Sequence, residues 1–205
     1  MNRGLLPFML ATSFAVSTPA WALFNAQVLT GKRTAKWSAD NRSSDTTTGT
    51  ELRAAAHIDP IPLVPVAFGI AASQTTFDDE STKFGVSKID GTDIDLEIEA
   101  WLPLELAGLV PYAKLSYTIA GKYEMETITG TSFRPKAVYK PTGAALHVGI
   151  KYEFLLRLGI MAEFESGNRK LEFDKVTDAG NLDIQGLSDV DQNSTSILIG
   201  VQAGL

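Results

Sequence analysis

The sequence contains no cysteine, which excludes disulfides, cysteine-bound metal centres and a lipid anchor on an N-terminal cysteine. Basic residues are also scarce: 18 Lys and Arg face 24 Asp and Glu, for a net charge of −6. Nucleic-acid binding needs clustered Lys and Arg for phosphate contacts, and we therefore expect no nucleic-acid partner. No segment reaches about 18 consecutive apolar residues, so membrane-spanning helices are not expected either.

The first 22 residues have the pattern of a cleavable export signal. Arg3 gives a positive start, residues 5–16 form a mostly apolar stretch, and residues 20–22 (Ala-Trp-Ala) form a small-x-small cleavage site. The apolar stretch is shorter than the about 20 residues that a transmembrane helix needs. We therefore expect a signal peptide at residues 1–22 and a single domain at residues 23–205.

The remaining chain contains eight segments in which apolar and polar residues alternate with a period of two, the pattern of a β-strand. They lie near residues 24–37, 51–58, 66–75, 93–102, 114–123, 146–154, 156–165 and 196–205, and only the first is ambiguous. Short links near 59–63, 103–111 and 153–157 alternate with long polar links near 38–49, 77–91, 124–141 and 167–191. This rhythm predicts an all-β fold, an eight-stranded antiparallel up-and-down β-barrel.

Two features of the polar face indicate that it points into the barrel, so that the apolar face contacts lipid. Glycines such as Gly149, Gly159 and Gly200 fall on it, and the narrow interior of an eight-stranded barrel favours small residues. With one further base from either Lys32 or Arg33, its charges nearly balance, as buried ion pairs require. We therefore expect a transmembrane barrel with a structural interior charge network of Glu51, Arg53, His57, Asp93, Asp95, Glu97, Glu99, Lys114, His147, Lys151, Arg157, Glu163 and Glu165.

Aromatic residues of the apolar face are expected to form rings at the two membrane surfaces. Phe24, Tyr152 and Phe154 mark the short-turn end, whereas Tyr123 and Phe164 mark the long-loop end. The same parity assigns Lys122 and Glu153 to the interior.

In these respects the chain resembles the small eight-stranded outer-membrane barrels of Gram-negative bacteria, of the OmpA, OmpX and OmpW type. The resemblance covers the mature chain and is architectural: an export signal, eight strands, alternating loop lengths and a strand at the C-terminus. It implies a monomer in the cell outer membrane, in contact with membrane lipid and lipopolysaccharide, whose last strand is recognised by the insertion machinery. Such barrels usually end in an aromatic residue, whereas this chain ends in Gly204-Leu205.

Lipid A-modifying enzymes also use small barrels, and they need a lipid-facing nucleophile beside a histidine and an acid. His57 and His147 both lie on the inward face, and neither is followed by a nearby serine. The acidic column Asp93, Asp95, Glu97, Glu99 places successive carboxylates about 6.6 Å apart, too far for all four to bind one metal ion. We therefore expect no catalytic, cofactor or metal site.

The leading hypothesis is an outer-membrane barrel filled by its own side chains, with a structural or surface-interaction role carried by four exposed loops. One alternative is a narrow channel or small-solute transporter, which the OmpW-like resemblance allows. A second alternative is a soluble periplasmic binder of the lipocalin type, which would have its apolar face inside.

Overall fold

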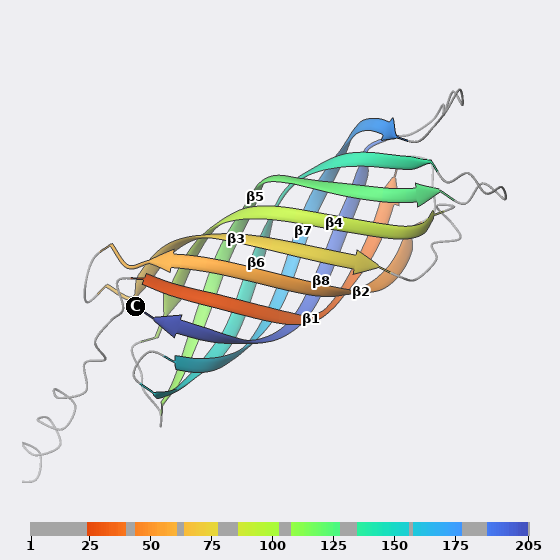
Figure 1. Cartoon of the computed structure of the whole chain (residues 1–205). Helices are drawn as coiled ribbons and strands as arrows, with labels where there is room; N and C mark the ends of the chain where they lie inside the picture. Colours follow the sequence, from red (N-terminus) through yellow and green to blue (C-terminus); the bar gives the residue numbers. More distant parts are fainter. Residues whose placement is uncertain are drawn as a thin grey trace, which may run out of the picture.

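The computed structural model describes residues 24–39, 44–60, 64–77, 86–102, 108–127, 135–155, 158–177 and 188–204. Its elements are eight strands: β1 (Phe24–Ala39), β2 (Asp45–Ile58), β3 (Val66–Phe77), β4 (Val86–Trp101), β5 (Leu109–Thr127), β6 (Lys136–Leu155), β7 (Leu158–Thr177) and β8 (Val190–Gly204). Each strand pairs antiparallel with the next, and β1 pairs with β8 to close the barrel (Figure 1). The predicted fold class is confirmed. The expected signal peptide and Arg157 lie outside the described residues.

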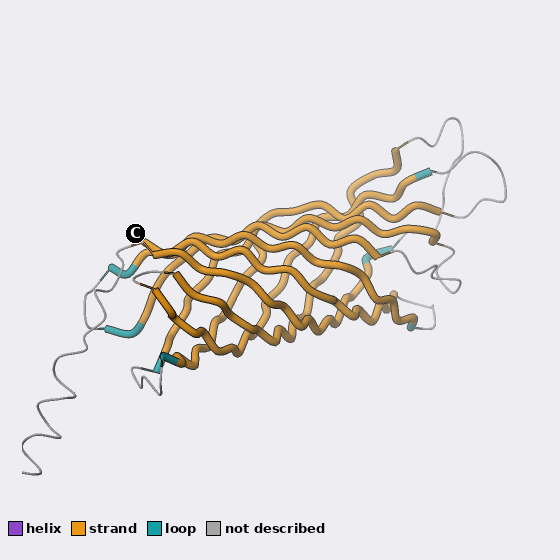
Figure 2. The backbone as a smooth tube through the Cα atoms, turned by 60° about the horizontal axis from the view of Figure 1, so that its bottom comes forward, coloured by secondary structure: helices purple, strands orange, loops and turns teal. Residues whose placement is uncertain are grey.

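The two ends of the barrel differ in the strands that they connect. At one end, here called the turn end, β2 is followed by β3, β4 by β5 and β6 by β7, and the chain ends there after β8 (Figures 1 and 2). The other four connections lie at the opposite end, here called the loop end. No helix that could span a bilayer occurs within the described ranges.

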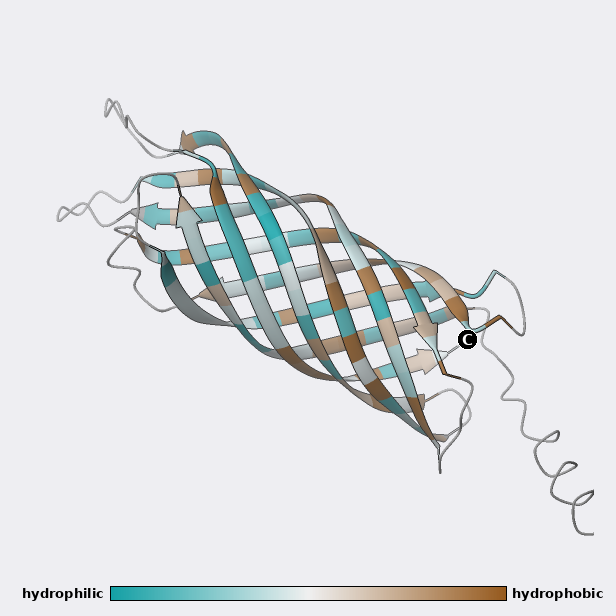
Figure 3. Ribbon diagram, turned by 180° about the vertical axis from the view of Figure 1, so that it is seen from behind, coloured by the Kyte–Doolittle hydropathy of each residue, from teal (hydrophilic) through white to brown (hydrophobic). Residues whose placement is uncertain are grey.

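In the half of the barrel next to the turn end, most outward-facing side chains are apolar and exposed. They form an apolar belt around the wall, with Ile197 68% and Leu115 61% exposed. The apolar belt consists of Val28, Leu52, Ile58, Phe68, Ile70, Ile94, Leu96, Ile98, Leu115, Tyr117, Ile119, Leu146, Val148, Ile150, Tyr152, Ile160, Phe164, Ile197, Ile199 and Val201 (Figure 3). This half of the barrel, the belt half, is apolar outside and charged inside. That arrangement argues against the soluble lipocalin-like alternative.

In the half next to the loop end, the loop half, the strands keep their alternation but exchange polarity. Outward positions such as Lys36, Thr46, Lys140 and Lys170 are polar and exposed. Inside lies an apolar cluster, here called the loop cluster, of Ala35, Trp37, Phe77, Val86, Ile89, Tyr123, Met125, Ala137, Tyr139, Leu171 and Val190. Trp37 is its centre: its ring lies 5.3 Å from the ring of Phe77 and 6.3 Å from that of Tyr123, both edge to face.

This exchange of polarity corrects the predicted strand ends. The link expected at 167–191 contains the last part of β7, which ends at Thr177. The link expected at 124–141 likewise contains the end of β5 and the first residues of β6. Each strand was predicted from apolar residues on its outward face. Those residues stop where the strand leaves the apolar belt, although the strand itself continues.

A bulge in β5 corrects two further predictions. The β5–β6 ladder is interrupted between Thr118 and Tyr123, and the β4–β5 ladder shifts its register opposite. The extra residue reverses the parity beyond it. Lys122, expected inside, is therefore exposed, and Tyr123, expected in an outward aromatic ring, is fully buried in the loop cluster.

Two residues explain why the bulge lies at this place. Gly121 has a φ of 156°, and a Cβ there would lie 2.3 Å from the carbonyl oxygen of Thr92. Pro141 on β6 lies against Gly121 and has no backbone N–H to donate. Because the β5–β6 ladder is interrupted here, no backbone hydrogen bond from residue 141 to β5 is needed. A proline can therefore occupy this position inside a strand of a closed barrel.

Candidate functional site: a buried charge network

The centre of the belt half is organised around Arg33 of β1, a fully buried guanidinium. Its nitrogens lie 2.8 Å from Glu165, 3.0 Å from Glu51 and 3.5 Å from Asp93. A second bond runs from Arg33 Nε to the Ser196 hydroxyl, which itself donates to Glu51 at 2.8 Å. Arg33 therefore joins carboxylates from β2, β4 and β7 across the barrel.

Two more arginines share these acids. Arg53 of β2 contacts Glu97 directly and lies 3.4 Å from Glu165. Arg169 of β7 lies 3.3 Å from Asp93 and 3.4 Å from Glu165. Glu165 is thus surrounded by three guanidinium groups, and desolvating so many charges is tolerable only because each has an opposite partner.

Nearer the turn end the cations are lysines. Lys114 contacts Glu163 and donates to the Gln27 amide oxygen at 3.2 Å, and Lys151 contacts Glu99. The Gln27 amide nitrogen in turn donates to Glu99 at 3.1 Å, so one neutral side chain bridges the two lysines. A smaller apolar cluster that includes Leu29, Trp101, Tyr112 and Met161 packs among these groups.

The structure places twelve of the thirteen residues expected in the network inside the barrel, each at most 5% exposed. The exception is Arg157, which lies outside the described residues. Glu153, also assigned to the interior, is exposed near the turn end and accepts a hydrogen bond from Gln202.

Sequence reasoning left open whether Lys32 or Arg33 faces inward, and it missed Arg169; the structure places Arg33 inside. Arg33 lies on β1, whose inward face also carries the apolar Leu29 and Trp37, and this mixture blurred the alternation. Arg169 lies where a loop was expected. No signal for it exists in the sequence, because residues 165–170 are polar or glycine on both faces, and the period of two appears only in the burial of β7.

The interior charges balance in a specific way. Among the described buried residues, seven carboxylates (Glu51, Asp93, Asp95, Glu97, Glu99, Glu163 and Glu165) face five fixed cations (Arg33, Arg53, Lys114, Lys151 and Arg169). The two histidines complete the set: His57 lies 2.9 Å from Glu97, and His147 lies 2.8 Å from Glu163. Both histidines thus contact carboxylates of the network.

Ser116, His147 and Glu163 form a connected chain within the network. The Ser116 hydroxyl lies 2.9 Å from Nε2 of His147, and Nδ1 of His147 lies 2.8 Å from Glu163. This is the order of nucleophile, base and acid in serine hydrolases. A serine does therefore lie beside His147, and it comes from the neighbouring strand β5 rather than from the adjacent sequence.

The other parts of an acyl-transfer site do not accompany this chain in the described residues. Ser116 is only 5% exposed. Its strand is paired on both sides, with Glu97 and Ala145 as its neighbours, so the ladder occupies the backbone N–H groups that could have formed an oxyanion hole. Glu163 also accepts a hydrogen bond from Tyr112 at 2.8 Å. The three groups serve as one more link in the network.

No group of three His, Asp or Glu side chains within the described ranges is arranged to hold a metal ion. The acidic column on β4 is instead divided among different cations. Arg33 and Arg169 contact Asp93, Arg53 contacts Glu97, and Lys151 contacts Glu99. The arrangement is suited to holding eight strands together around a charged centre.

Comparison with known proteins gives one family and a consistent fold. The model of the outer membrane protein beta-barrel domain family matches residues 6–203. Neisserial surface protein A (NspA) has 12% identity and a TM-score of 0.60, with 89% of this chain and 97% of that chain covered. The N-terminal barrel of Pseudomonas aeruginosa OprF has 12% identity and a TM-score of 0.52, with 90% of this chain and 99% of that chain covered. Pseudomonas aeruginosa OprG has 10% identity and a TM-score of 0.51, with 90% of this chain and 97% of that chain covered. No curated protein sequence matches.

Proposed function

Because the chain belongs to the outer membrane protein beta-barrel family, we propose that it is a non-enzymatic barrel of the Gram-negative outer membrane with a closed interior and a role at the cell surface. On this proposal residues 1–22 are removed during export, and the loop end faces the outside of the cell. The insertion machinery recognises β8, and the barrel is a monomer.

The observation that carries the proposal is the double closure of the interior. A solute that entered from the turn end would meet the ion pairs of Arg33 and Arg53, which are 0% exposed. One that entered from the loop end would meet the loop cluster, in which Trp37, Phe77 and Tyr123 are at most 1% exposed. An eight-stranded barrel is only just wide enough to be filled by its own side chains, so both layers would have to move for a solute to pass.

A surface role is supported by the loop half. Its strands extend beyond the apolar belt with polar side chains outside and the loop cluster inside, an arrangement that is stable in water. The four connections of the loop end are thereby carried on a packed platform that projects from the membrane. NspA, whose fold is similar, is named a surface protein.

Two measurements test the proposal. Residues 23–205, refolded in detergent, should migrate differently on a gel before and after boiling, and strand-type circular dichroism should appear only with detergent present. The same material in planar bilayers should remain electrically silent, while a large porin treated identically gives channel steps. Discrete steps from several independent preparations would overturn the closed interior and favour the narrow-channel alternative. Folding in plain buffer without a gel shift would overturn the membrane barrel itself.

A further inference from the structure

Four buried polar atoms without a hydrogen-bond partner among the described residues gather on the inner faces of three neighbouring strands. They are Nε of Arg53 on β2, Oγ of Ser73 on β3, and Oδ1 of Asp93 and Oδ2 of Asp95 on β4. All four residues are at most 6% exposed. These four atoms are here called the β3 site. Buried polar groups of native proteins nearly always have a partner, which is either another protein group or an ordered water molecule.

The other polar atoms of the charged residues in the β3 site are already bonded. Arg53 uses its terminal nitrogens for ion pairs with two glutamates. Oδ2 of Asp93 accepts a hydrogen bond from Tyr123 at 3.0 Å, and Oδ1 of Asp95 accepts one from Thr118 at 2.7 Å. These bonds hold each side chain in place and leave its remaining polar atom for a further partner.

The strand register brings the four residues of the β3 site together. Ser73 pairs with Arg53 on one side and with Asp93 on the other. Asp95 is the next inward residue of β4 toward the turn end. Side chains of directly paired residues on one face of a sheet lie about 5 Å apart, so a small molecule between them can reach more than one strand.

β3 itself cannot bridge these groups with a side chain. Its inward residues from 67 to 73 are Ala, Gly, Ala and Ser. Ala71 pairs with Ala55 on β2 and with Asp95 on β4, so two methyl groups lie side by side next to the Asp95 carboxylate. The β3 site is therefore polar and bordered by small residues, the conditions under which a buried water molecule is expected.

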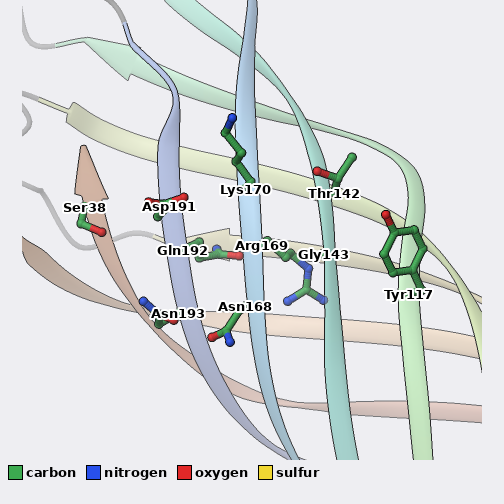
Figure 4. Close-up of a pocket in the computed structure, with 10 residues that line it drawn as sticks. All are labelled: Ser38, Tyr117, Thr142, Gly143, Asn168, Arg169, Lys170, Asp191, Gln192 and Asn193. Atoms are coloured by element: carbon green, nitrogen blue, oxygen red, sulfur yellow. The ribbon is translucent and has the colours of Figure 1, made fainter. Parts of the chain in front are cut away.

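Gln192 of β8 offers a contrast. Both polar atoms of its buried amide also lack a partner among the described residues. Together with Arg169 it lines a groove of about 540 Å³, but exposed residues of the outer wall, among them Tyr117 and Lys170, line this groove as well (Figure 4). The groove is open to the outside of the barrel, whereas the β3 site is enclosed.

We propose that the β3 site binds a water molecule that is part of the folded barrel. A buried water molecule makes up to four hydrogen bonds. The carboxylate oxygens of Asp93 and Asp95 accept its two protons, while Nε–H of Arg53 and the hydroxyl of Ser73 donate to its oxygen. A sodium ion could bind the same oxygens, but the neighbouring Arg53 guanidinium would repel it. The site thus matches water in its donors, its acceptors and its charge.

The bound water gives the charge network a second link across the barrel wall. Glu165 of β7 already connects Arg53 with Arg33 through its carboxylate. The water connects Arg53 with Asp93 over β3, on the opposite side of the barrel. This inference goes beyond the role proposed for the loop end and needs only the folded barrel.

The first test detects the water molecule by NMR. The mature chain, residues 23–205, is labelled with ¹⁵N-arginine and refolded in deuterated detergent micelles, and magnetisation transfer from water to each arginine Nε–H is measured. Arg53 should show a cross peak with the sign of a long-lived bound water. Arg33 is the matched control, because its Nε donates to the Ser196 hydroxyl at 3.1 Å, and its cross peak should be several-fold weaker.

Ser73→Ala separates bound water from a relayed signal, since a hydroxyl proton that exchanges with solvent can produce the same cross peak. The Arg53 peak should persist in this variant, because three partners of the water remain. Each sample is first shown to be folded by its gel shift. Absence of the Arg53 peak in the wild type, or its loss in Ser73→Ala, would overturn the proposal.

Urea unfolding gives a second test, in which the sign of the effect decides. Ser194→Ala is the control, because Ser194 is similarly buried and accepts a hydrogen bond from Arg169 at 3.3 Å. If water bonds to Ser73, Ser73→Ala loses a hydrogen bond and should lower the midpoint as the control does. A higher midpoint would show that the hydroxyl has no partner and would contradict the proposal. A wild-type midpoint that rises with sodium chloride but not with choline chloride would assign the site to a cation instead.

Discussion

The two halves of the barrel are built on the same eight strands with opposite polarity. In the belt half, leucines and isoleucines face outward and Arg33, Arg53 and Glu165 are buried. In the loop half, lysines and threonines face outward and Trp37, Phe77 and Tyr123 are buried. A strand such as β1 passes from one regime to the other within four residues, between Arg33 and Trp37, without losing its alternation.

The difference teaches which force holds each half. Next to lipid, an apolar interior would gain little, because lipid tails are as apolar as a leucine core. The belt half therefore depends on the closed backbone ladder and on ion pairs across the interior. The loop half is surrounded by water, where burying an aromatic side chain is favourable in itself. Substitutions that exchange the two kinds of interior should therefore fail for different reasons.

The largest effect is expected from Arg33→Met in the belt half. The substitution leaves Glu51, Glu165 and Asp93 without their shared cation, and breaking a buried pair costs roughly 3 to 5 kcal/mol. Lys32→Met is the matched control, because it removes one positive charge from the neighbouring residue on the outer face. Urea unfolding in detergent, followed by the gel shift, should show a large loss for Arg33→Met only. Equal midpoints for the two variants would contradict the role given to the network.

A smaller and local effect is expected from Trp37→Ala in the loop half. The variant loses the ring contacts with Phe77 and Tyr123 and a 2.7 Å bond from the indole to Thr47, for about 3 kcal/mol. Because the cluster lies beyond the belt, hydrogen exchange should quicken at the loop-end residues of β1 and β2 and stay slow at their turn-end residues. Uniform acceleration along both strands would show that the halves unfold as one unit.

The same contrast shows what the sequence could predict. The acidic face of β4 was predictable because its four carboxylates alternate with apolar residues within the apolar belt. In that half, apolar residues face outward and charged residues face inward. The loop-end parts of β5, β6 and β7 were not predictable. Beyond the belt the outward face is polar and the inward face apolar, and a polar outward face resembles a loop in the sequence. The prediction of an eight-stranded barrel was correct despite these errors, because it depends on the number of alternating segments and on the order of short and long links.

Contacts across the barrel were harder to predict than the facing of each strand. The parity of Lys122 and Tyr123 depends on the extra residue Ile119 of the β5 bulge, and the sequence marks this place only by the isolated glycine Gly121 that follows. The approach of Ser116 to His147 depends on the register between β5 and β6, which alternation does not fix. Such pairings follow from closure of the whole ladder rather than from any one segment.

Ser116→Ala should have a modest effect on stability and none on chemistry. It removes a single buried hydrogen bond to His147, worth about 1 kcal/mol, while the contact of His147 with Glu163 remains. The folded wild type should not react with a fluorophosphonate probe, because Ser116 is enclosed by its own ladder. Labelling that disappears in Ser116→Ala would reveal an accessible nucleophile and overturn the structural role.

The smallest effect concerns the exposed ion pairs of the loop half. The hydrogen bond from Lys140 to Asp174, 2.6 Å long, lowers the pKa of the Asp174 carboxyl below its ordinary value. The contribution of the pair to stability is therefore present above the pKa of the unfolded chain and is lost as the pH falls through the lower folded pKa.

In Lys140→Gln the pKa of Asp174, followed by NMR in micelles, should rise toward that of a free aspartate. Asp189 is the internal control, because its own pKa is lowered by Lys170 and by the backbone N–H of Phe173 and should not move. Water screens this pair, so the unfolding midpoint should hardly change, in contrast to the loss expected for Arg33→Met. A comparable destabilisation by Lys140→Gln would mean that charge pairing matters equally in both halves, and the division between them would fail.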